Sequence, residues 1–372
     1  MKLTIERAAL LRSLNHIQSV VERRNTIPIL ANVMVEANAS GVNLTATDMD
    51  ISIVDSAEAT AATSGATTAP AHTLYDIVRK LPDGAQIELD AGGDNDRLTL
   101  SAGRSRFTLA TLPTADFPTM SAGDLPHTFS VPADDLRALV DRTRFAISTE
   151  ETRYYLNGIY LHAVEIDSVS VLRAVATDGH RLARVEMPMP EGAAGMPGII
   201  IPRKTVNELR KLIDECGVDI KISLSDTKIR FAFGGTVLTS KLIDGTFPDY
   251  EKVIPVNNDK LLEVDCRQFA EAVDRVATIS TERSRSVKLE IGDNSLTLSA
   301  SSPDAGSATE EIEVSYGKEA IEIGFNSKYL LDIAQQVEGD VAQVLFADGA
   351  SPTIVRDSAD GSALYVLMPM RV

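Results

Sequence analysis

Residues 1–14, MKLTIERAALLRSL, begin with a short alternating strand, Leu3-Thr4-Ile5, that runs directly into a helical pattern. The same combination returns at Phe129-Ser130-Val131 and at Leu262-Glu263-Val264. After each strand, apolar residues recur with the spacing of a helix that buries one face. They are Leu10, Leu14 and Val20, then Leu136, Val140 and Ala146, then Phe269, Val273 and Ile279. The matching offsets indicate a threefold repeat.

A second helical pattern lies between these three and also occurs three times. It begins at Pro70, Pro202 and Asn326, residue types that suit the first turn or the cap of a helix. The apolar residues that follow are Leu74 and Ile77, Val206 and Leu209, and Leu330 and Ile333. We expect these helices to end near Gly84, Gly217 and Gly339, where glycine can adopt the left-handed conformation.

Alternating strands separated by turn residues follow each of these helices, as in Ile220/Ile222/Leu224 and Ile229/Phe231/Phe233. The sequence therefore predicts about six helix-plus-sheet units, paired into three similar α+β domains. Their predicted bounds are 1–126, 127–255 and 256–372, with Pro-containing connectors at 118–126 and 248–258.

Composition limits the class of protein. A chain of 372 residues with 44% apolar residues is long enough for two or three domains with real cores. Its two cysteines, Cys216 and Cys266, are far apart, which excludes a cysteine-only zinc site and gives no disulfide framework. The N-terminus lacks the apolar region of a signal peptide, and no apolar run approaches the ~18 residues of a membrane span. We therefore expect a cytoplasmic protein without cofactors.

The charge distribution points to a use for the repeat. The net charge of −17 by itself argues against nucleic acid, but the predicted helices are positive overall and the remainder carries the negative balance. A row of sheet domains leaves strand edges at its ends, and a head-to-tail contact that closes gives a ring. Twelve helices from two chains, ~10 Å apart, would enclose a bore of roughly 38 Å, enough for duplex DNA.

Two other classes of function are open from the residues alone. Asp178-Gly179-His180-Arg181 could place a general base beside an orienting carboxylate, as in a hydrolase. However, the sequence has no Gly-x-Ser-x-Gly elbow, P-loop, dinucleotide fingerprint or metal-ligand spacing to accompany it. A non-catalytic repeat scaffold that binds only proteins would explain the repeats and the acidity, but not the basic helices.

Several segments, in their order and spacing over the whole chain, resemble the family of the β subunit of bacterial DNA polymerase III, the β sliding clamps. They are Ile27-Pro28-Ile29-Leu30, Gly103-Arg104-Ser105-Arg106-Phe107, Arg153-Tyr154-Tyr155-Leu156-Asn157-Gly158, Ala176-Thr177-Asp178-Gly179-His180-Arg181-Leu182, Ile201-Pro202-Arg203-Lys204, Phe247-Pro248-Asp249-Tyr250 and Val366-Leu367-Met368-Pro369-Met370-Arg371. The resemblance implies a non-catalytic, ring-shaped head-to-tail homodimer with helices lining the hole. A clamp loader would place it on DNA, where it would tether the polymerase and other replication and repair proteins.

The resemblance also implies three sets of site residues. The peptide-binding pocket would comprise Leu156, Thr177, Gly179, His180, Arg181, Leu182, Pro248, Lys252, Val253, Asn326, Tyr329, Val366, Leu367, Met368, Pro369, Met370 and Arg371. The residues that contact duplex DNA without regard to its sequence would be Arg24, Arg153, Tyr154, Tyr155, Arg203 and Lys204. The dimer contact would involve Phe107 at one end of the chain and Thr278-Ile279 toward the other.

Ordinary structural roles are the alternatives at these positions. Lys and Arg on helices are often plain solvated surface. One ring of the Tyr154-Tyr155 pair could pack inward, and Met368 and Met370 could be core residues. The family pattern is also broken at a few sites, where DNA affinity or the edges of the pocket would change. They are His72, Thr73, Glu150, Lys252, Pro352 and Val372.

Overall fold

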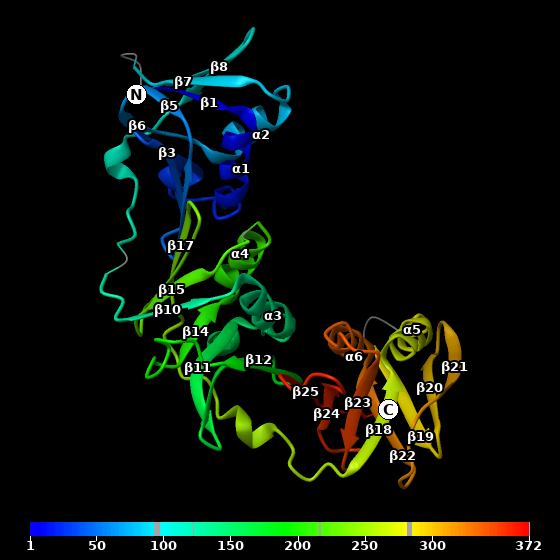
Figure 1. Cartoon of the computed structure of the whole chain (residues 1–372). Helices are drawn as coiled ribbons and strands as arrows, with labels where there is room; N and C mark the ends of the chain where they lie inside the picture. The colour runs from blue at the N-terminus through cyan, green and yellow to red at the C-terminus, as the bar shows by residue number, and fades with distance from the viewer. Residues whose placement is uncertain (93–96, 122, 216, 281–284, 372) are drawn as a thin grey trace. The chain divides into compact units, whose positions relative to one another are not determined.

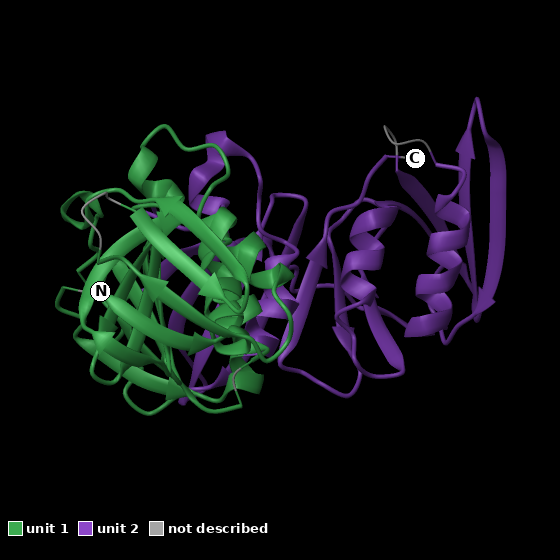
Figure 2. Cartoon of the chain, turned by 90° about the horizontal axis from the view of Figure 1, so that it is seen from above, with its two compact units in different colours: residues 1–136, 190–197, 204–242 green, residues 137–189, 198–203, 243–372 purple. Residues whose placement is uncertain are grey.

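The computed structural model describes residues 1–92, 97–121, 123–215, 217–280 and 285–371 (Figure 1). Cys216 and Val372 therefore lie outside the described residues. Contacts between residues divide the chain into two compact units, coloured separately in Figure 2. Unit 1 comprises residues 1–136, 190–197 and 204–242, and unit 2 comprises residues 137–189, 198–203 and 243–372.

Unit 1 contains two antiparallel sheets. The smaller has the strand order β5-β1-β7-β8-β9, with β1 Lys2–Glu6, β5 Thr60–Thr63, β7 Gln86–Asp90, β8 Arg97–Ala102 and β9 Ser105–Ala110. The larger has the order β10-β15-β16-β17-β4-β3-β2-β6. Its strands are β2 Asn32–Asn38, β3 Gly41–Thr47, β4 Ile51–Ala57, β6 Gly65–Pro70, β10 His127–Val131, β15 Ile220–Leu224, β16 Lys228–Phe233 and β17 Thr236–Lys241. The helices are α1 Arg7–Ile17, α2 Ala71–Lys80 and, after its first residue, α4 Arg203–Ile213, with short turns η1 Pro28–Ala31 and η2 Thr114–Asp116.

Unit 2 also contains two antiparallel sheets. The larger has the order β14-β11-β12-β13-β25-β24-β23-β18 and the smaller the order β21-β20-β19-β22. The larger comprises β11 Gly158–Ile166, β12 Val169–Thr177, β13 Arg181–Pro188, β14 Ile199–Pro202, β18 Lys260–Asp265, β23 Val341–Phe346, β24 Thr353–Asp357 and β25 Ala363–Leu367. The smaller comprises β19 Ser286–Gly292, β20 Ser295–Ser302, β21 Gly306–Glu313 and β22 Ile321–Asn326. The helices are most of α3 Ala133–Arg144, then α5 Cys266–Ala277 and α6 Ser327–Ala334, with short turns η3 Glu151–Leu156 and η4 Tyr250–Val253.

The repeated apolar pattern corresponds to the buried faces of the helices, as predicted. Leu10 and Leu14 of α1 are fully buried, and Phe269 and Val273 occupy the same positions in α5. Helix α1 packs against α2 in unit 1, and α5 packs against α6 in unit 2. Each pair covers sheet residues that alternate between buried and exposed positions, so the two periodicities together define the core.

The predicted ends of the second set of helices are wrong by several residues. Helices α2, α4 and α6 end at Lys80, Ile213 and Ala334, before the glycines. After α2 the cause is local: Leu81 precedes a proline, which disfavours the helical conformation, and it adopts an extended one with ψ of 154°. Pro70 lies at the cap position rather than within the first turn.

Both large sheets continue across the predicted domain borders. Strand β17 pairs with β4, with Leu238 opposite Ile53, and β13 pairs with β25, with Ala183 opposite Tyr365. This pairing draws the two halves of the middle repeat into different compact units. The predicted borders themselves stay a prediction.

The second predicted connector, 248–258, is more than a linker. It contains η4, and its Tyr250 is buried at 5% exposure. Cys266, the cysteine within the described residues, is buried. None of the helices in the described ranges is both long and apolar enough to cross a membrane.

Candidate peptide-binding and nucleic-acid sites

Strand pairing in unit 2 brings together two segments of the predicted pocket that lie far apart in the sequence. Strands β13 and β25 place Arg181 opposite Leu367 and Leu182 opposite Val366. Just beyond the strands, the amide of Met368 donates a hydrogen bond of 2.9 Å to the carbonyl of His180. The segments 177–182 and 366–371 therefore lie side by side.

A buried apolar cluster forms beneath these segments. Leu156, Leu182 and Val366, all predicted pocket residues, are at most 4% exposed and pack with Phe247 and Tyr250. Thr177 and Leu367 are buried as well. These side chains form an apolar floor on and beside the paired strands β13 and β25.

Exposed apolar side chains lie on the segment 366–371 and at the end of η4. Val253 is 51% exposed, Met368 41% and Met370 37%. The alternative that the two methionines are core residues is therefore wrong. Met370 is fixed by a backbone hydrogen bond of 2.8 Å to Gly324, and with Pro369 and Arg371 it lines a hollow of about 530 Å³. Flexible exposed methionines suit a surface that accepts more than one peptide.

Arg181 proves to be a buried cross-link rather than an exposed anchor. Its guanidinium donates to Asp178 at 3.1 Å, to Asp332 of α6 at 2.5 Å and to the carbonyl of Phe145 at 2.6 Å. It also lies 4.3 Å from the centre of the Tyr329 ring. Because these partners come from three different segments, Arg181 holds α6 against β13.

The Asp178-His180 pair does not have the geometry of a catalytic dyad. One carboxylate oxygen of Asp178 accepts hydrogen bonds from the amides of His180 and Arg181, and the other accepts from Arg181 Nε. The His180 ring instead stacks on Tyr329 with a centroid distance of 6.3 Å. In the described ranges no group of His, Cys, Asp and Glu could hold a metal ion. The hydrolase interpretation therefore finds no support at this motif.

A buried polar network, which was not expected from the sequence, holds the segment 247–253 that carries part of the predicted pocket. Arg173 in β12 is 2% exposed at its side chain and donates to Glu186 at 2.8 Å, to the Tyr250 hydroxyl at 2.6 Å and to Glu251 at 2.7 Å. His162 lies 3.1 Å from the same hydroxyl. Burial, reinforced by the charge of Arg173, lowers the pKa of His162 to about 4. The sequence does contain one sign of this network, because an arginine in the middle of an apolar strand must find buried partners.

Aromatic stacking anchors the same wall. Tyr160 of β11 stacks between His162 at 4.4 Å and Phe247 at 4.9 Å. Phe247 and Tyr250 thus fasten the segment 247–253 to the sheet, while the other side chains of this segment are exposed. The exposed residues include the predicted pocket residues Pro248, Lys252 and Val253. Lys252 forms an exposed ion pair of 2.9 Å with Asp249.

Gly179 connects the pocket to the predicted DNA-contacting loop. Its φ of +88° favours glycine, and a Cβ atom there would lie 2.6 Å from Arg153 Nη1. Arg153 is held by Glu150 through contacts of 2.8 and 2.7 Å. This ion pair with Glu150 raises the pKa of Arg153. The departure at Glu150 therefore offsets the charge of a residue predicted to meet phosphate.

The two tyrosines of this loop have different environments. Tyr154 is 53% exposed, whereas Tyr155 packs against the apolar floor. Their rings meet edge to face at 5.7 Å. The alternative that one ring packs inward is confirmed for Tyr155. Two other predicted DNA-contacting residues, Arg24 in unit 1 and Arg203 at the start of α4, are exposed.

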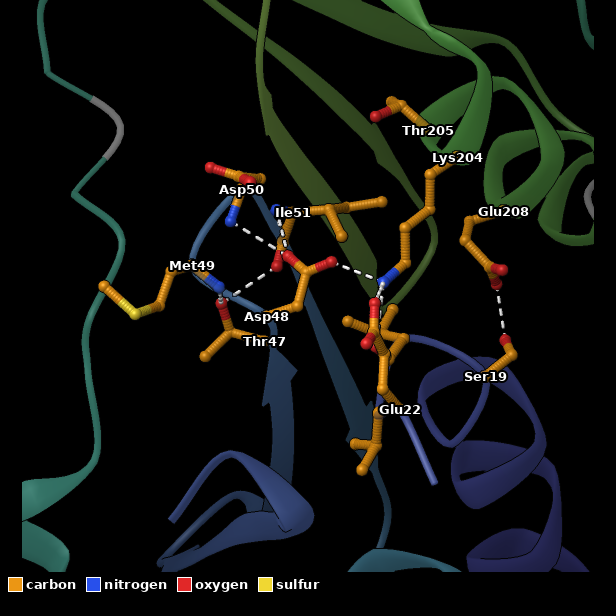
Figure 3. A network of polar contacts seen from close by, with 12 residues as sticks. Ser19, Glu22, Thr47, Asp48, Met49, Asp50, Ile51, Lys204, Thr205 and Glu208 are labelled. Atoms are coloured by element: carbon orange, nitrogen blue, oxygen red, sulfur yellow. Dashed lines mark hydrogen bonds and ion pairs between the residues drawn. The ribbon is translucent and has the colours of Figure 1, made fainter. Parts of the chain in front are cut away.

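Lys204 lies in a polar network within unit 1 (Figure 3). Its ammonium group donates to Asp48 in the turn after β3, to Glu22 at 3.3 Å and to the carbonyl of Val20 at 3.3 Å. Burial alone would lower the pKa of Lys204, but the hydrogen bond to Asp48 outweighs it and the pKa is raised. The ammonium of Lys204 is thus occupied by carboxylates, so it serves here to join α4 to the first repeat.

Two further contacts join the same elements. Glu208 of α4 accepts a hydrogen bond from Ser19, which follows α1 (Figure 3). His16 of α1 lies between Asp55 of β4 at 2.9 Å and Glu215 at 2.8 Å. Burial would lower the pKa of His16, but these two carboxylates raise it.

The predicted dimer residues lie at the ends of elements. Phe107 is half-buried in β9, the outer strand of its sheet, and lines a hollow of about 450 Å³ beside α2. Thr278 is exposed as the cap residue of α5, and Ile279 follows it half-buried. Phe107 belongs to unit 1, and Thr278 and Ile279 belong to unit 2.

The remaining departures from the family pattern have local roles. His72 Nε2 lies 2.9 Å from the carbonyl of Val21, and Thr73 is exposed beside the hollow that contains Phe107. The carbonyl of Pro352 accepts a hydrogen bond of 2.9 Å from Asn258.

Comparison with known proteins gives matches over nearly the whole chain. Family models described as the N-terminal, central and C-terminal domains of the DNA polymerase III beta subunit match residues 1–121, 130–249 and 251–371. The beta sliding clamp of Caulobacter vibrioides is 56% identical over 372 residues, and that of Escherichia coli K12 is 38% identical over 373, each with full coverage of both chains.

Solved structures agree with this match. A crystal structure of the Caulobacter crescentus beta sliding clamp has a TM-score of 0.98 at 56% identity, covering 100% of this chain and 99% of that one. The sliding clamp of Bartonella birtlesii bound to griselimycin has a TM-score of 0.97 at 50% identity, with full coverage of both chains. Three consecutive domains with sheets and helices are thus shared throughout. The chain belongs to the DNA polymerase III beta subunit family.

Proposed function

We propose that this protein is the sliding clamp of its replicative polymerase: a ring that encircles duplex DNA and tethers the polymerase to it. The observation that carries the proposal is the match of the entire chain to clamp proteins, with three domain models in consecutive order. The role is non-catalytic, since binding and topological linkage are sufficient for tethering. A protein that acts on chromosomal DNA in a bacterium would work in the cytoplasm.

The ring would be a head-to-tail homodimer of three-domain chains, with domains at 1–126, 127–255 and 256–372. Strand β9 ends one sheet and β21 ends another, so each offers an edge that can pair with a second copy. Arg106 of β9 is exposed, and β21 carries Glu310, Glu311 and Glu313. Opposite charges favour the pairing of β9 of one chain with β21 of the second copy. Phe107 of the first chain would then lie close to Thr278-Ile279 of the second.

DNA contact would be loose and independent of base sequence. Arg24 and Arg203 are exposed for phosphate, and the exposed ring of Tyr154 can lie against the DNA backbone or an unpaired base. Arg153 and Lys204 remain in the proposed set, although carboxylates already offset their charges. Tyr155 would support Tyr154 from below.

Partner proteins would bind in the groove above the apolar floor. The polymerase, the clamp loader and repair proteins would each insert an extended apolar peptide between Val253, Met368 and Met370. His180, Tyr329 and Asn326 would supply polar contacts at one end of the groove. Asn326 Oδ1 accepts a hydrogen bond of 3.0 Å from the Lys328 amide and so fixes the first turn of α6.

The test is retention on nicked circular DNA after treatment with a clamp loader, before and after one cut that linearises the circle. A clamp should survive high salt on the circle and be lost from the linear molecule. Equal retention on both would show ordinary surface binding and refute the ring. A scaffold that binds only proteins would be retained on neither.

A further inference from the structure

A second hollow in unit 2 adjoins the peptide groove, and its lining contains more cations than carboxylates. It has a volume of about 450 Å³ and lies where the end of α3, the start of α4 and the start of α6 meet the 178–181 turn. We call it the basic hollow and define it by Arg144, Arg203, Arg285, Lys328, His180 and Tyr329. Three of these, Arg203, Arg285 and Lys328, are exposed.

The acidic residues of this hollow are already occupied. Of the two that line it, Glu150 is paired with Arg153 and Asp178 with Arg181. Arg144 has an ion pair of 3.0 Å with Asp141. In contrast, within the described part of the chain no ion pair forms with Arg203, Arg285 or Lys328. The hollow therefore presents a surplus of positive charge that an incoming anion can use.

The basic hollow borders the apolar groove at His180. His180 lines the hollow, and its carbonyl accepts the amide of Met368, which is an exposed residue of the groove. Tyr329, on which His180 stacks, and Asn326 line the same hollow. A peptide whose apolar side chains lie at Met368 can thus place its neighbouring residues beside Arg285 and Lys328.

We propose that the basic hollow binds acidic side chains of partner peptides, so that this clamp prefers segments with Asp or Glu next to their apolar residues. This inference rests on the proposed function and names the chemistry of its partners. The chain carries a net charge of −17, so an acidic peptide is repelled by most of its surface and attracted at this hollow.

A peptide fits this lining better than the DNA backbone does. Phosphate groups offer only acceptors and bring no apolar side chain for the exposed Met368 beside the hollow. A peptide offers carboxylates for Arg285 and Lys328 together with apolar side chains for Met368. The combination of these cations with an adjoining apolar surface therefore favours a peptide over a strand of DNA.

The test compares two short labelled peptides that share a Leu-Leu-Phe segment, preceded by two Asp in one and two Asn in the other. Fluorescence anisotropy on the full chain measures both dissociation constants. We expect the acidic peptide to bind about tenfold more tightly at low salt, with the advantage falling to about twofold at high salt. In the double variant R285Q/K328Q the advantage should also fall to about twofold. Lys318→Gln, an exposed cation outside the hollow, should preserve it.

Equal affinity of the two peptides for the unsubstituted protein would overturn the inference. So would an equal loss of preference in Lys318→Gln, because the effect would then come from net charge. Weaker DNA retention of R285Q/K328Q with an unchanged peptide preference would assign the hollow to DNA instead. Failure of the Asn peptide to bind, or binding insensitive to Met368→Asp, would refute the proposed groove itself and the inference with it.

Discussion

Replacing Arg173 with methionine should both destabilise unit 2 and weaken the peptide groove. Arg173 is 2% exposed at its side chain and bonds Glu186, the Tyr250 hydroxyl and Glu251. Methionine fills a similar space but leaves these acceptors without their donor. Removing one partner of a buried ion pair costs about 3–5 kcal/mol. Glu186 keeps Arg184 at 3.4 Å and is 17% exposed at its side chain, so we expect the lower end, about 3 kcal/mol.

The assay is urea unfolding followed by circular dichroism, because the chain contains no tryptophan. The same variant should bind the Asn peptide at least about tenfold more weakly, since η4 loses its attachment to β12. Arg173→Lys should restore part of both, because it keeps the charge without the forked geometry. Arg356→Met is the matched control, since this arginine is exposed and bonds only Gln343 among the contacts described for it.

An unfolding free energy for R173M within about 0.5 kcal/mol of the unsubstituted protein would refute this reasoning. It would mean that the network does not hold the wall. Reduced stability with unchanged peptide affinity would show that Arg173 supports the sheet alone.

Three further outcomes can be measured. Lys204→Met should lower the free energy of unfolding in urea by about 1–2 kcal/mol, because its carboxylate partners in unit 1 lose their cation. It should reduce retention on DNA less than Arg24→Gln does. An equal reduction in the two variants would show that Lys204 contacts DNA. Glu150→Gln should free Arg153 and strengthen duplex binding about two- to threefold at low salt by anisotropy, and unchanged affinity would count against the ion pair. The pKa of His162 is about 4 when folded against 6.5 unfolded, so the unfolded state binds the proton first and stability falls as pH drops from about 6.5 to 4. His162→Phe should remove about 1 kcal/mol of the stability lost between pH 7 and 4.5, a value reduced because the imidazole is partly exposed. The same pH dependence of unfolding in the variant and the unsubstituted protein would contradict this.

The repeat made much of the fold predictable. Helical spacing of apolar residues and strand alternation are local patterns, and both report directly which side of an element is buried. Leu10, Leu14, Phe269 and Val273 were therefore predicted correctly as core. Helix ends were less predictable because a single neighbour such as the proline after Leu81 decides them.

The sequence by itself determined the repeat, the α+β class, the buried helix faces and the family, because each is encoded in order and spacing. Only the tertiary structure decided what individual charges do. The sequence does not show the partners of Arg181, Arg173 and Lys204, yet each is bound by a carboxylate from a distant segment of the chain. The cost of burying a charge depends on partners that folding brings together, so no local pattern reports it. The joining of repeats by β17 with β4 and β13 with β25 was hidden for the same reason: strand pairing is a long-range contact.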